Sequence, residues 1–233
     1  MRKGEAAKIT GLLERYGTLL DEVDRWFNSC LDKYPQMIDC RKGCSYCCRG
    51  LFDITLLDAF YLKEGIDLLP EETRKSVIRK SAERIREINT KKPAFVHPWI
   101  LNDIAEDEWE EIMPEDDEAP CILLSDAGMC LAYRHRPMTC RLNGIPLIDV
   151  TGEEMFDDWC TMNFIGADPV KMNGLRHDFN SLFRQELLLF REFSFQLLGR
   201  RVNELDTIIP AAVFYDVQES DSLAYSLLRS VCN

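Results

Sequence analysis

Residues 40–48 read CRKGCSYCC, so four of the ten cysteines of this 233-residue chain fall within one short segment. Their spacing is C-x3-C-x2-C-C. A thiolate is a soft, strongly donating ligand, and several thiolates brought together by a tight turn suit zinc, cuprous copper or an iron–sulfur cluster better than magnesium or calcium. Gly43 gives the backbone the freedom that such a turn needs. The sequence therefore predicts a metal site organised around this segment.

The adjacent pair Cys47 and Cys48 limits the geometry of such a site. Neighbouring side chains of an extended or turning backbone diverge, so two adjacent sulfurs rarely serve one tetrahedral ion. We expect them to reach two metals, or two corners of one cluster, with further ligands from elsewhere in the chain. The alternative roles for these cysteines are small buried hydrophobes or disulfide partners.

Composition is typical of a soluble globular protein, and the 46% of hydrophobic residues is enough for a sizeable core in a single domain over residues 1–233. No apolar run typical of a signal peptide or a membrane span occurs in the sequence. We therefore expect a cytoplasmic protein. In a reducing compartment, densely spaced cysteines are more typical of metal binding than of disulfides.

The formal net charge of −12 argues against binding to nucleic acid or to an anionic membrane, because both need a basic face. Much of this charge lies between Glu106 and Glu118, where nine residues are acidic and none is basic. We expect a solvated, mobile connection there, since the segment lacks the spacing and central glycine of a calcium loop.

Apolar residues at spacings of three and four predict amphipathic helices in several parts of the chain. Cys30 lies on the apolar stripe of the first, which favours burial over a ligand role. Thr55 is expected to cap the second helix and Gly65 to end it, and the helix near the C-terminus is expected to be buried on more than one face. A short strand is expected at residues 50–54. The expected helices span residues 9–34, 55–65, 70–92, 174–200, 208–215 and 222–228.

A second concentration of cysteines runs from residue 120 to residue 160. Residues 120–124 and 129–133 are expected to form a hairpin that brings Cys121 near Cys130. Cys140 and Cys160 follow. One group of four cysteines thus lies between residues 40 and 48, and a second group of four lies between residues 121 and 160.

The expected fold is mainly α with short β hairpins. Its irregular, metal-stapled cysteine core (40–160) is packed by amphipathic helices, with helical additions at 1–39 and 161–233.

The cysteine motifs C-x3-C-x2-C-C, Pro-Cys-x-Leu-Leu, Gly-x-Cys-x-x-Tyr and Arg-Pro-x-x-Cys-Arg, followed by a last cysteine, resemble those of the CxxCxxCC cysteine-cluster family, described as a zinc- or iron-chelating domain. The resemblance implies eight metal ligands and leaves Cys30 and Cys232 outside the site. The last motif departs from the family pattern, because Thr and Met follow Cys160 where Pro and Gly are expected. The implied ligands are Cys40, Cys44, Cys47, Cys48, Cys121, Cys130, Cys140 and Cys160.

The choice of metal is between a [4Fe-4S] cluster and zinc. Only Cys44 and Cys47 have zinc-knuckle spacing, and no histidine lies in a paired ligand pattern, whereas a cluster tolerates scattered thiolates. His97 stands alone, and we expect a structural role for it. Three arginines, Arg134, Arg136 and Arg141, accompany the second group and would offset thiolate charge. Since Arg136 and Arg141 belong to the matched motif, we expect these two to contact the cofactor, and we favour iron–sulfur over zinc.

An enzymatic role is the alternative. Residues 40–47 have the C-x3-C-x2-C spacing of radical S-adenosylmethionine enzymes, and some proteins with this cysteine cluster are described as flagellin lysine methylases. The alternative function is therefore an iron–sulfur, S-adenosylmethionine-dependent protein lysine methyltransferase, with a protein substrate. The chain lacks the strand–helix alternation of that enzyme fold, and Cys48 can fill the open iron position. We expect a closed metal site that organises the fold. Metal ions are the expected ligands, and a protein substrate or partner is an additional possibility.

Overall fold

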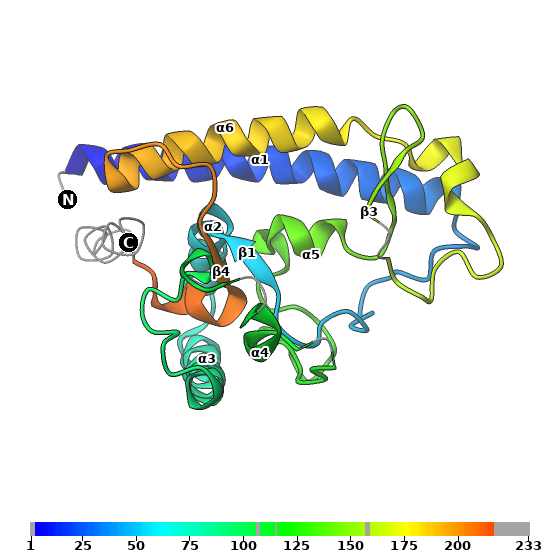
Figure 1. Ribbon diagram of the computed structural model, residues 1–233. Coiled ribbons are helices and arrows are strands. Elements are labelled where there is room, and N and C mark those ends of the chain that lie inside the picture. Colours follow the sequence, from blue (N-terminus) through cyan, green and yellow to red (C-terminus); the bar gives the residue numbers. More distant parts are fainter. Residues whose placement is uncertain (1–2, 106–107, 115, 157–158, 217–233) are drawn as a thin grey trace.

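The computed structural model describes residues 3–105, 108–114, 116–156 and 159–216, and most of its ordered elements are helices (Figure 1). The strands are short and form two-stranded antiparallel sheets, so the predicted class, mainly α with short β hairpins, is confirmed. One sheet pairs β2 (Leu147–Ile148) with β3 (Glu154–Phe156). The other pairs β1 (Asp53–Thr55) with the distant β4 (Asp206–Ile208), which the sequence did not predict.

The main helices of the described residues are α1 (Lys3–Lys33), α2 (Leu56–Asp67), α3 (Glu71–Lys91) and α6 (Phe179–Leu198). Two short α-helices are α4 (Trp109–Ile112) and α5 (Met138–Leu142). Short 3-10 helices are η1 (Leu101–Asp103), η3 (Tyr133–His135), η4 (Pro169–Lys171), η5 (Asn173–Leu175) and η6 (Ile209–Phe214).

Helices α1 and α6 lie side by side and run in opposite directions, as Figure 1 shows. The predicted stripe of α1 is the reason, because Leu13, Tyr16 and Leu20 are fully buried there. Helix α1 also contacts α2 and α5, so it lies between α6 and the part of the chain that carries Cys140. The apolar cluster that includes these residues continues into α2, α3 and η6. The division of the chain into a cysteine core with two helical additions stays a prediction.

Helix α2 begins as predicted but ends later. The Thr55 hydroxyl accepts the N–H of Asp58 at 3.0 Å, which caps the first turn. Gly65 was expected to stop the helix, and this was wrong, since α2 continues to Asp67. A side chain at Gly65 would meet His135, with a Cβ only 2.4 Å from the Cβ of that histidine. Glycine is needed here because another segment packs closely against the helix.

The C-terminal predictions need two corrections. Helix α6 is amphipathic and leaves Leu187, Leu188 and Phe195 exposed, so it is not buried on more than one face. It ends at Gly199, in the left-handed conformation that favours glycine. Residues 208–215 begin in β4 and continue as the 3-10 helix η6. The helix expected at 222–228 and Cys232 lie outside the described residues.

The described part of the acidic segment is docked onto α3, which corrects the expectation of a solvated connection. Ile112 of α4 is buried, and Lys92 pairs with Glu108 at 2.7 Å and with Glu111 at 3.4 Å. Asp117 forms an ion pair with Arg84 of α3. Apolar packing, Arg84 of α3 and Lys92 directly after α3 together hold the segment.

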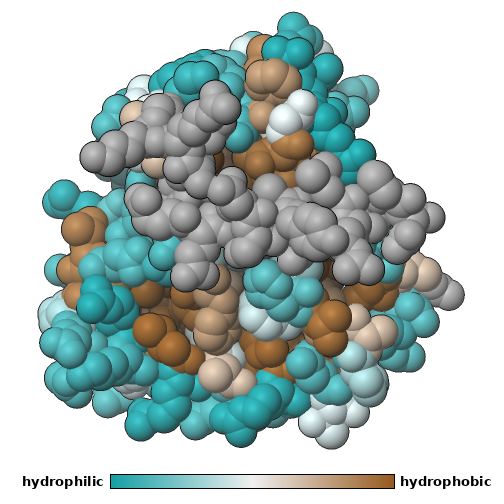
Figure 2. All heavy atoms as spheres, turned by 90° about the vertical axis from the view of Figure 1, so that its left-hand side faces the viewer, coloured by the Kyte–Doolittle hydropathy of each residue, from teal (hydrophilic) through white to brown (hydrophobic). Residues whose placement is uncertain are grey.

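The end of the molecule where α6 finishes shows apolar side chains among hydrophilic ones (Figure 2). On this face several apolar side chains, coloured brown, lie next to one another and form patches.

In the described part of the chain, we find no helix whose length and hydrophobicity would allow it to cross a membrane.

Candidate metal centre

The segment that carries the first four cysteines is a series of tight turns. The N–H of Cys44 donates to the carbonyl of Arg41 at 2.9 Å, and the N–H of Cys48 donates to that of Ser45 at 3.0 Å. Gly43 has φ +89°, the left-handed conformation that the turn was expected to require. These turns follow one another without a regular element between them.

The second cysteine segment forms only the end of the expected hairpin. The N–H of Ser125 donates to the carbonyl of Met129 at 2.9 Å and the N–H of Leu131 donates to that of Leu123 at 2.8 Å, on either side of the bridge between Leu124 and Cys130. Residues 121–124 make a turn, in which the N–H of Leu124 donates to the carbonyl of Cys121 at 2.9 Å, so the regular pairing does not extend to Cys121. The chain also pairs with the first cysteine segment. Arg49 and Pro120 form a bridge, and the N–H of Cys121 donates to the carbonyl of Cys48 at 2.9 Å. Cys48 and Cys121, far apart in the sequence, are thus direct backbone neighbours.

The thiols of Cys47 and Cys48 affect each other's pKa, since their interaction raises the pKa of Cys47 and lowers that of Cys48. The divergence expected for these adjacent side chains stays a prediction. The Cys48 thiol also lies near enough to the other thiols of this region for their charges to affect its pKa; these are Cys121, Cys130 and Cys140.

Cys40 lies beside Cys160, and Asn163 connects them. The N–H of Asn163 donates to the carbonyl of Cys160 at 2.9 Å, while its side-chain amide donates to Cys40 Sγ at 3.3 Å and to the carbonyl of Gly144. Its Oδ1 accepts the N–H of Asp39 at 2.7 Å. Asn163 is 3% exposed and was missed by the sequence analysis, since a lone asparagine after the last cysteine carries no recognisable pattern.

Burial holds several of these thiols protonated. It raises the pKa of Cys121 to about 11 and also raises those of Cys40, Cys130 and Cys140. Metal ligation requires the thiolate, so an incoming ion displaces these protons. Metal affinity should therefore increase with pH.

Arg141 is a buried structural residue with its side chain 1% exposed. Its guanidinium pairs with Asp24 of α1 and donates to the carbonyls of Arg136 at 3.0 Å and Arg134 at 2.6 Å. These bonds fix α5, and with it Cys140, to α1. The expected contact of Arg141 with a cofactor stays a prediction, and the hydrogen bonds described give it a different role.

Arg136 faces the cysteines. Its Nη2 donates to Asp24 at 2.9 Å, and its guanidinium lies 4.2 Å from the centre of the Tyr133 ring. Its positive charge offsets part of the rise in the pKa of Cys47, which comes mainly from Cys48, and in that of Cys130, which comes mainly from burial. The Nε atom of Arg136 is buried with no acceptor among the described residues, so a donor remains available beside the thiols.

The remaining candidates lie apart from this arrangement. Cys30 is fully buried on α1, with its sulfur 3.9 Å from the carbonyl of Gly174. The His97 ring packs against Trp99, with 5.0 Å between ring centroids, and burial lowers its pKa. Both placements agree with the structural roles expected for them.

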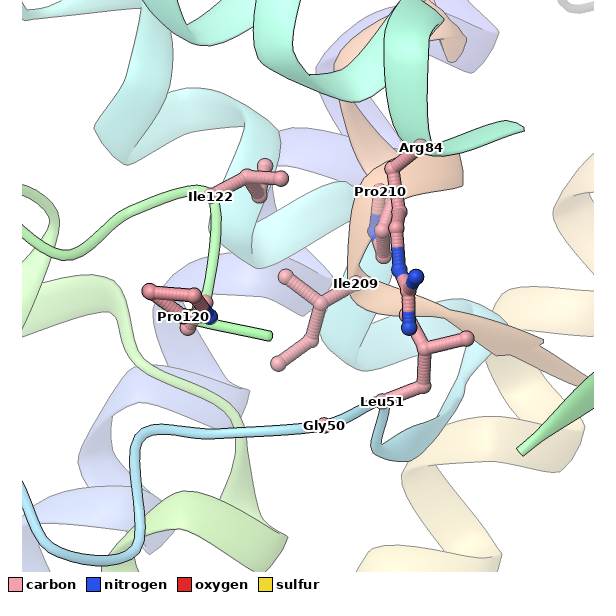
Figure 3. Close-up of a pocket in the computed structure, with 8 residues that line it drawn as sticks. Gly50, Leu51, Arg84, Pro120, Ile122, Ile209 and Pro210 are labelled. Atoms are coloured by element: carbon pink, nitrogen blue, oxygen red, sulfur yellow. The ribbon is translucent and has the colours of Figure 1, made fainter. Parts of the chain in front are cut away.

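A small hollow lies behind Cys121 (Figure 3). Arg84 reaches down from α3, and Ile209 and Pro210 approach from η6. Gly50, Leu51, Pro120 and Ile122 complete the lining. Its volume of about 10 Å³ is the size of one water molecule, too small for a substrate such as S-adenosylmethionine.

In the part of the chain that the structure describes, no group of three or more Cys, His, Asp or Glu side chains has a geometry that would hold a metal ion. The chemistry of the donor set nevertheless fits a soft metal. Two cysteine segments are joined through Cys48 and Cys121, and the guanidinium of Arg136, whose buried Nε has no acceptor among the described residues, acts through its charge on Cys47 and Cys130. Both features suit bound thiolates.

Comparison with known proteins identifies this region. The sequence model of the CxxCxxCC family, described as "Putative zinc- or iron-chelating domain", matches residues 39–161, more than half of the chain. The match begins just before Cys40 and ends just after Cys160. No curated protein and no solved structure matches the chain.

Proposed function

We propose that this chain, which belongs to the CxxCxxCC family of zinc- or iron-chelating domains, binds metal through eight cysteines and holds it as an iron–sulfur cluster in preference to zinc. The observation that carries the proposal is the direct backbone contact between Cys48 and Cys121. It joins the two halves of the cysteine set, which are distant in the sequence. The proposed ligands are Cys40, Cys44, Cys47, Cys48, Cys121, Cys130, Cys140 and Cys160.

Metal would stabilise this contact. Closing the loop from Cys48 to Cys121 costs about 4 kcal/mol of chain entropy. Structural zinc in small domains binds with roughly 10 to 16 kcal/mol, which exceeds that cost. The metal can therefore organise the segments between α1 and α6, while the apolar helices keep their own packing.

Hydrogen-bond donors near the sulfurs favour a cluster. Asn163 already donates to Cys40 Sγ, and Arg136 has a buried Nε–H without an acceptor in the described structure. Donors to cluster sulfurs and a nearby cation stabilise the negative charge of a thiolate-bound cluster and adjust its reduction potential. Zinc would use the same thiolates, with less need for additional donors.

Elemental analysis of anaerobically purified protein tests this function. We expect iron with acid-labile sulfide, a brown colour and broad absorbance near about 400 nm. The double variant C48S/C121S should lose metal, whereas C30S, which changes a buried cysteine outside the set, should retain it. Less than one equivalent of total iron, zinc and copper in the wild type would refute chelation. A colourless zinc protein would refute the cluster but keep chelation.

We further propose that the metal has an organising role with no open coordination position. Eight thiolates are more than an open cluster needs. Addition of S-adenosylmethionine to the reduced protein should leave the spectrum unchanged and yield no 5'-deoxyadenosine. Cleavage of the cosubstrate would overturn the closed site and favour the methyltransferase.

A further inference from the structure

We propose that Cys48 and Cys121 are a site of reversible oxidation to a disulfide, and that this modification competes with metal for the same two sulfurs. Both cysteines are free thiols in the structure. The competition rests on the proposed metal chelation. The disulfide itself rests only on the way in which the two cysteine segments pair.

Cys48 and Cys121 lie opposite each other in a short antiparallel pairing. The bridge between Arg49 and Pro120 sets the register, and the N–H of Cys121 donates to the carbonyl of Cys48 at 2.9 Å. Residues that face each other in a hydrogen-bonded antiparallel pair have Cα atoms about 5.5 Å apart, with both side chains on one face. Disulfides join Cα atoms that are about 4.4–6.8 Å apart. The backbone is therefore already spaced for the bond.

The pairing is held by contacts that do not involve a metal. The N–H of Gly50 donates to the carbonyl of Ala119 at 2.8 Å, and the N–H of Ala119 donates to Asp117 Oδ1 at 3.0 Å. Asp117 is in turn ion-paired with Arg84 of α3. Gly50 has φ +70°, and a Cβ at this position would lie only 3.0 Å from the carbonyl oxygen of Asp117. The two backbones thus approach closely and are fixed to a helix.

The neighbouring cysteines have other places in this pairing. Cys47 lies in the turn before the paired residues, so it is not the residue opposite Cys121. Cys130 is bridged to Leu124, at the far end of the turn that begins at Cys121. Within the described residues, the backbone bridges place one pair of cysteines opposite each other, and this pair is Cys48 with Cys121.

A peroxide is the oxidant that balances the reaction. One thiolate attacks an oxygen of hydrogen peroxide, the O–O bond breaks, and hydroxide leaves a sulfenic acid behind. The second thiolate attacks this sulfur, the S–S bond forms as the S–O bond breaks, and a second hydroxide leaves. With the two thiol protons, both hydroxides become water. Cys48 and Cys121 are each half-buried, which leaves access for an oxidant of this size.

The disulfide and the metal exclude each other. Metal ligation requires thiolates, so oxidation of Cys48 and Cys121 removes two of the proposed ligands. A bound metal in turn occupies the electron pairs that would attack the peroxide. Either bond joins the two cysteine segments at the same point. The metal would do so under reducing conditions and the disulfide under oxidising conditions.

Peptide mapping of the oxidised protein tests the site. The reduced wild type is freed of metal with EDTA, treated with one equivalent of hydrogen peroxide, alkylated, and digested with trypsin without a reductant. We expect tryptic residues 43–49 linked to residues 92–134, with fragment spectra that assign the bond to Cys48 and Cys121. Dithiothreitol should release the two peptides. In concentrated urea, which removes the backbone pairing, the preference for this pair should disappear.

Substitutions of adjacent cysteines provide the matched controls. C48S and C121S should lose the cross-link, whereas C47S and C130S should retain it. Loss of the cross-link from C47S or C130S, or its retention in C48S or C121S, would overturn the assignment. Fragment spectra of the wild type decide the same question without any variant. A wild type that forms no link between the two peptides, or links them through other sulfurs, would also overturn the site.

Zinc binding separates the disulfide from the proposed function. Zinc-loaded wild type should form less cross-link than the metal-free protein, and cross-linked protein should bind less zinc until it is reduced. Equal zinc binding by the cross-linked and reduced forms would overturn the competition. A wild type that forms the cross-link but binds neither zinc nor iron would overturn the chelation, and with it the competition, while the disulfide site would stand.

Discussion

The α1–α6 pair and the cysteine segments are held together by different forces. Along α1, fully buried residues such as Leu13 and Leu20 exclude water, and this apolar burial stabilises the pair without a ligand. The cysteine segments are joined by single backbone contacts, such as those of Cys48 with Cys121 and of Arg49 with Pro120. We infer that the helical pair needs no ligand for its stability, whereas the cysteine segments would gain most from the proposed metal.

Two polar clusters connect these regions. Asp24 of α1 pairs with Arg136 and Arg141 on either side of Cys140. Asp58 of α2 accepts hydrogen bonds from Tyr16 at 2.7 Å and from the N–H of Met138 at 2.9 Å. The position of the proposed metal ligands thus depends on two helices, α1 and α2, that contain none of them.

The largest effect is expected from removing apolar volume in the helical region. Phe60 is 1% exposed, and its ring lies 5.2 Å from Phe193 and 5.7 Å from Tyr215. F60A should lower the free energy of unfolding by about 3–5 kcal/mol. Metal per folded molecule should stay unchanged. Urea denaturation measures the first and elemental analysis the second, with L68A, at a residue 76% exposed, as the control. If folded F60A molecules contained less metal than folded wild-type molecules, the stability of the helical region and metal binding by the cysteine segments would not be separate properties.

Replacement of Arg141 should affect both regions. R141M leaves Asp24 with Arg136 alone, leaves the carbonyl of Arg136 without a side-chain donor, and leaves that of Arg134 with only the Tyr61 hydroxyl at 3.5 Å. We expect a loss of about 3 kcal/mol in the free energy of unfolding and weaker metal binding, since α5 carries Cys140. Urea denaturation and chelator competition measure these changes. The control is R134M, because that side chain is exposed and its carbonyl is retained. If R141M and R134M lowered stability and metal affinity equally, the ion pair between Arg141 and Asp24 would have no specific role in connecting the two regions.

The difference between the regions also explains what the sequence could predict. The spacing of Leu13, Tyr16 and Leu20 specifies a buried helix face locally, so α1 was predicted correctly, as was the cap at Thr55. The bounds and burial of other elements depend on packing partners far away in the sequence. The continuation of α2 past Gly65, the pairing of β1 with β4 and the exposure of Leu188 are examples.

Within the candidate site, residue types and spacing identified the cysteines but not their arrangement. The hairpin expected at 120–133 forms only around Leu124 and Cys130, and Pro120 pairs with Arg49 instead, because strand propensity does not indicate which backbone is the partner. Asn163 could not be found from the sequence, since its role arises only when Asp39 and Gly144 lie beside it. The different positions of Arg136 and Arg141 likewise depend on Asp24.

A smaller, pH-dependent effect is expected where α1 meets α6. Burial and the charge of Asp58 raise the pKa of Glu186 to about 8. Its unfolded pKa is near 4.3, so the native state binds more protons between about pH 5 and pH 8, and stability falls as pH rises through this range. In E186Q this fall should be markedly smaller, because the amide does not titrate. Urea denaturation across that range is the measurement, with E192Q as control because Glu192 pairs with Arg15 in an exposed position. If the free energy of unfolding changed with pH in the same way for the wild type and E186Q, the raised pKa of Glu186 would be contradicted.

The smallest effect should come from Asn163, and it separates the role of a neighbouring donor from that of a ligand. N163A removes the hydrogen bond to Cys40 Sγ and the links to Asp39 and Gly144, but it leaves every cysteine in place. Residues that orient metal ligands typically contribute about 10-fold or more to affinity, so we expect metal affinity to fall about 10-fold with the stoichiometry unchanged. N163D keeps an acceptor for the N–H of Asp39 but replaces the donor to the sulfur with a negative charge, and it should weaken binding at least as much. Chelator competition measures both, with N173A at an exposed asparagine as the control. If N163D bound metal as tightly as the wild type, the N–H···S bond would have no part in holding the site, and Asn163 would act through the backbone of Asp39 alone.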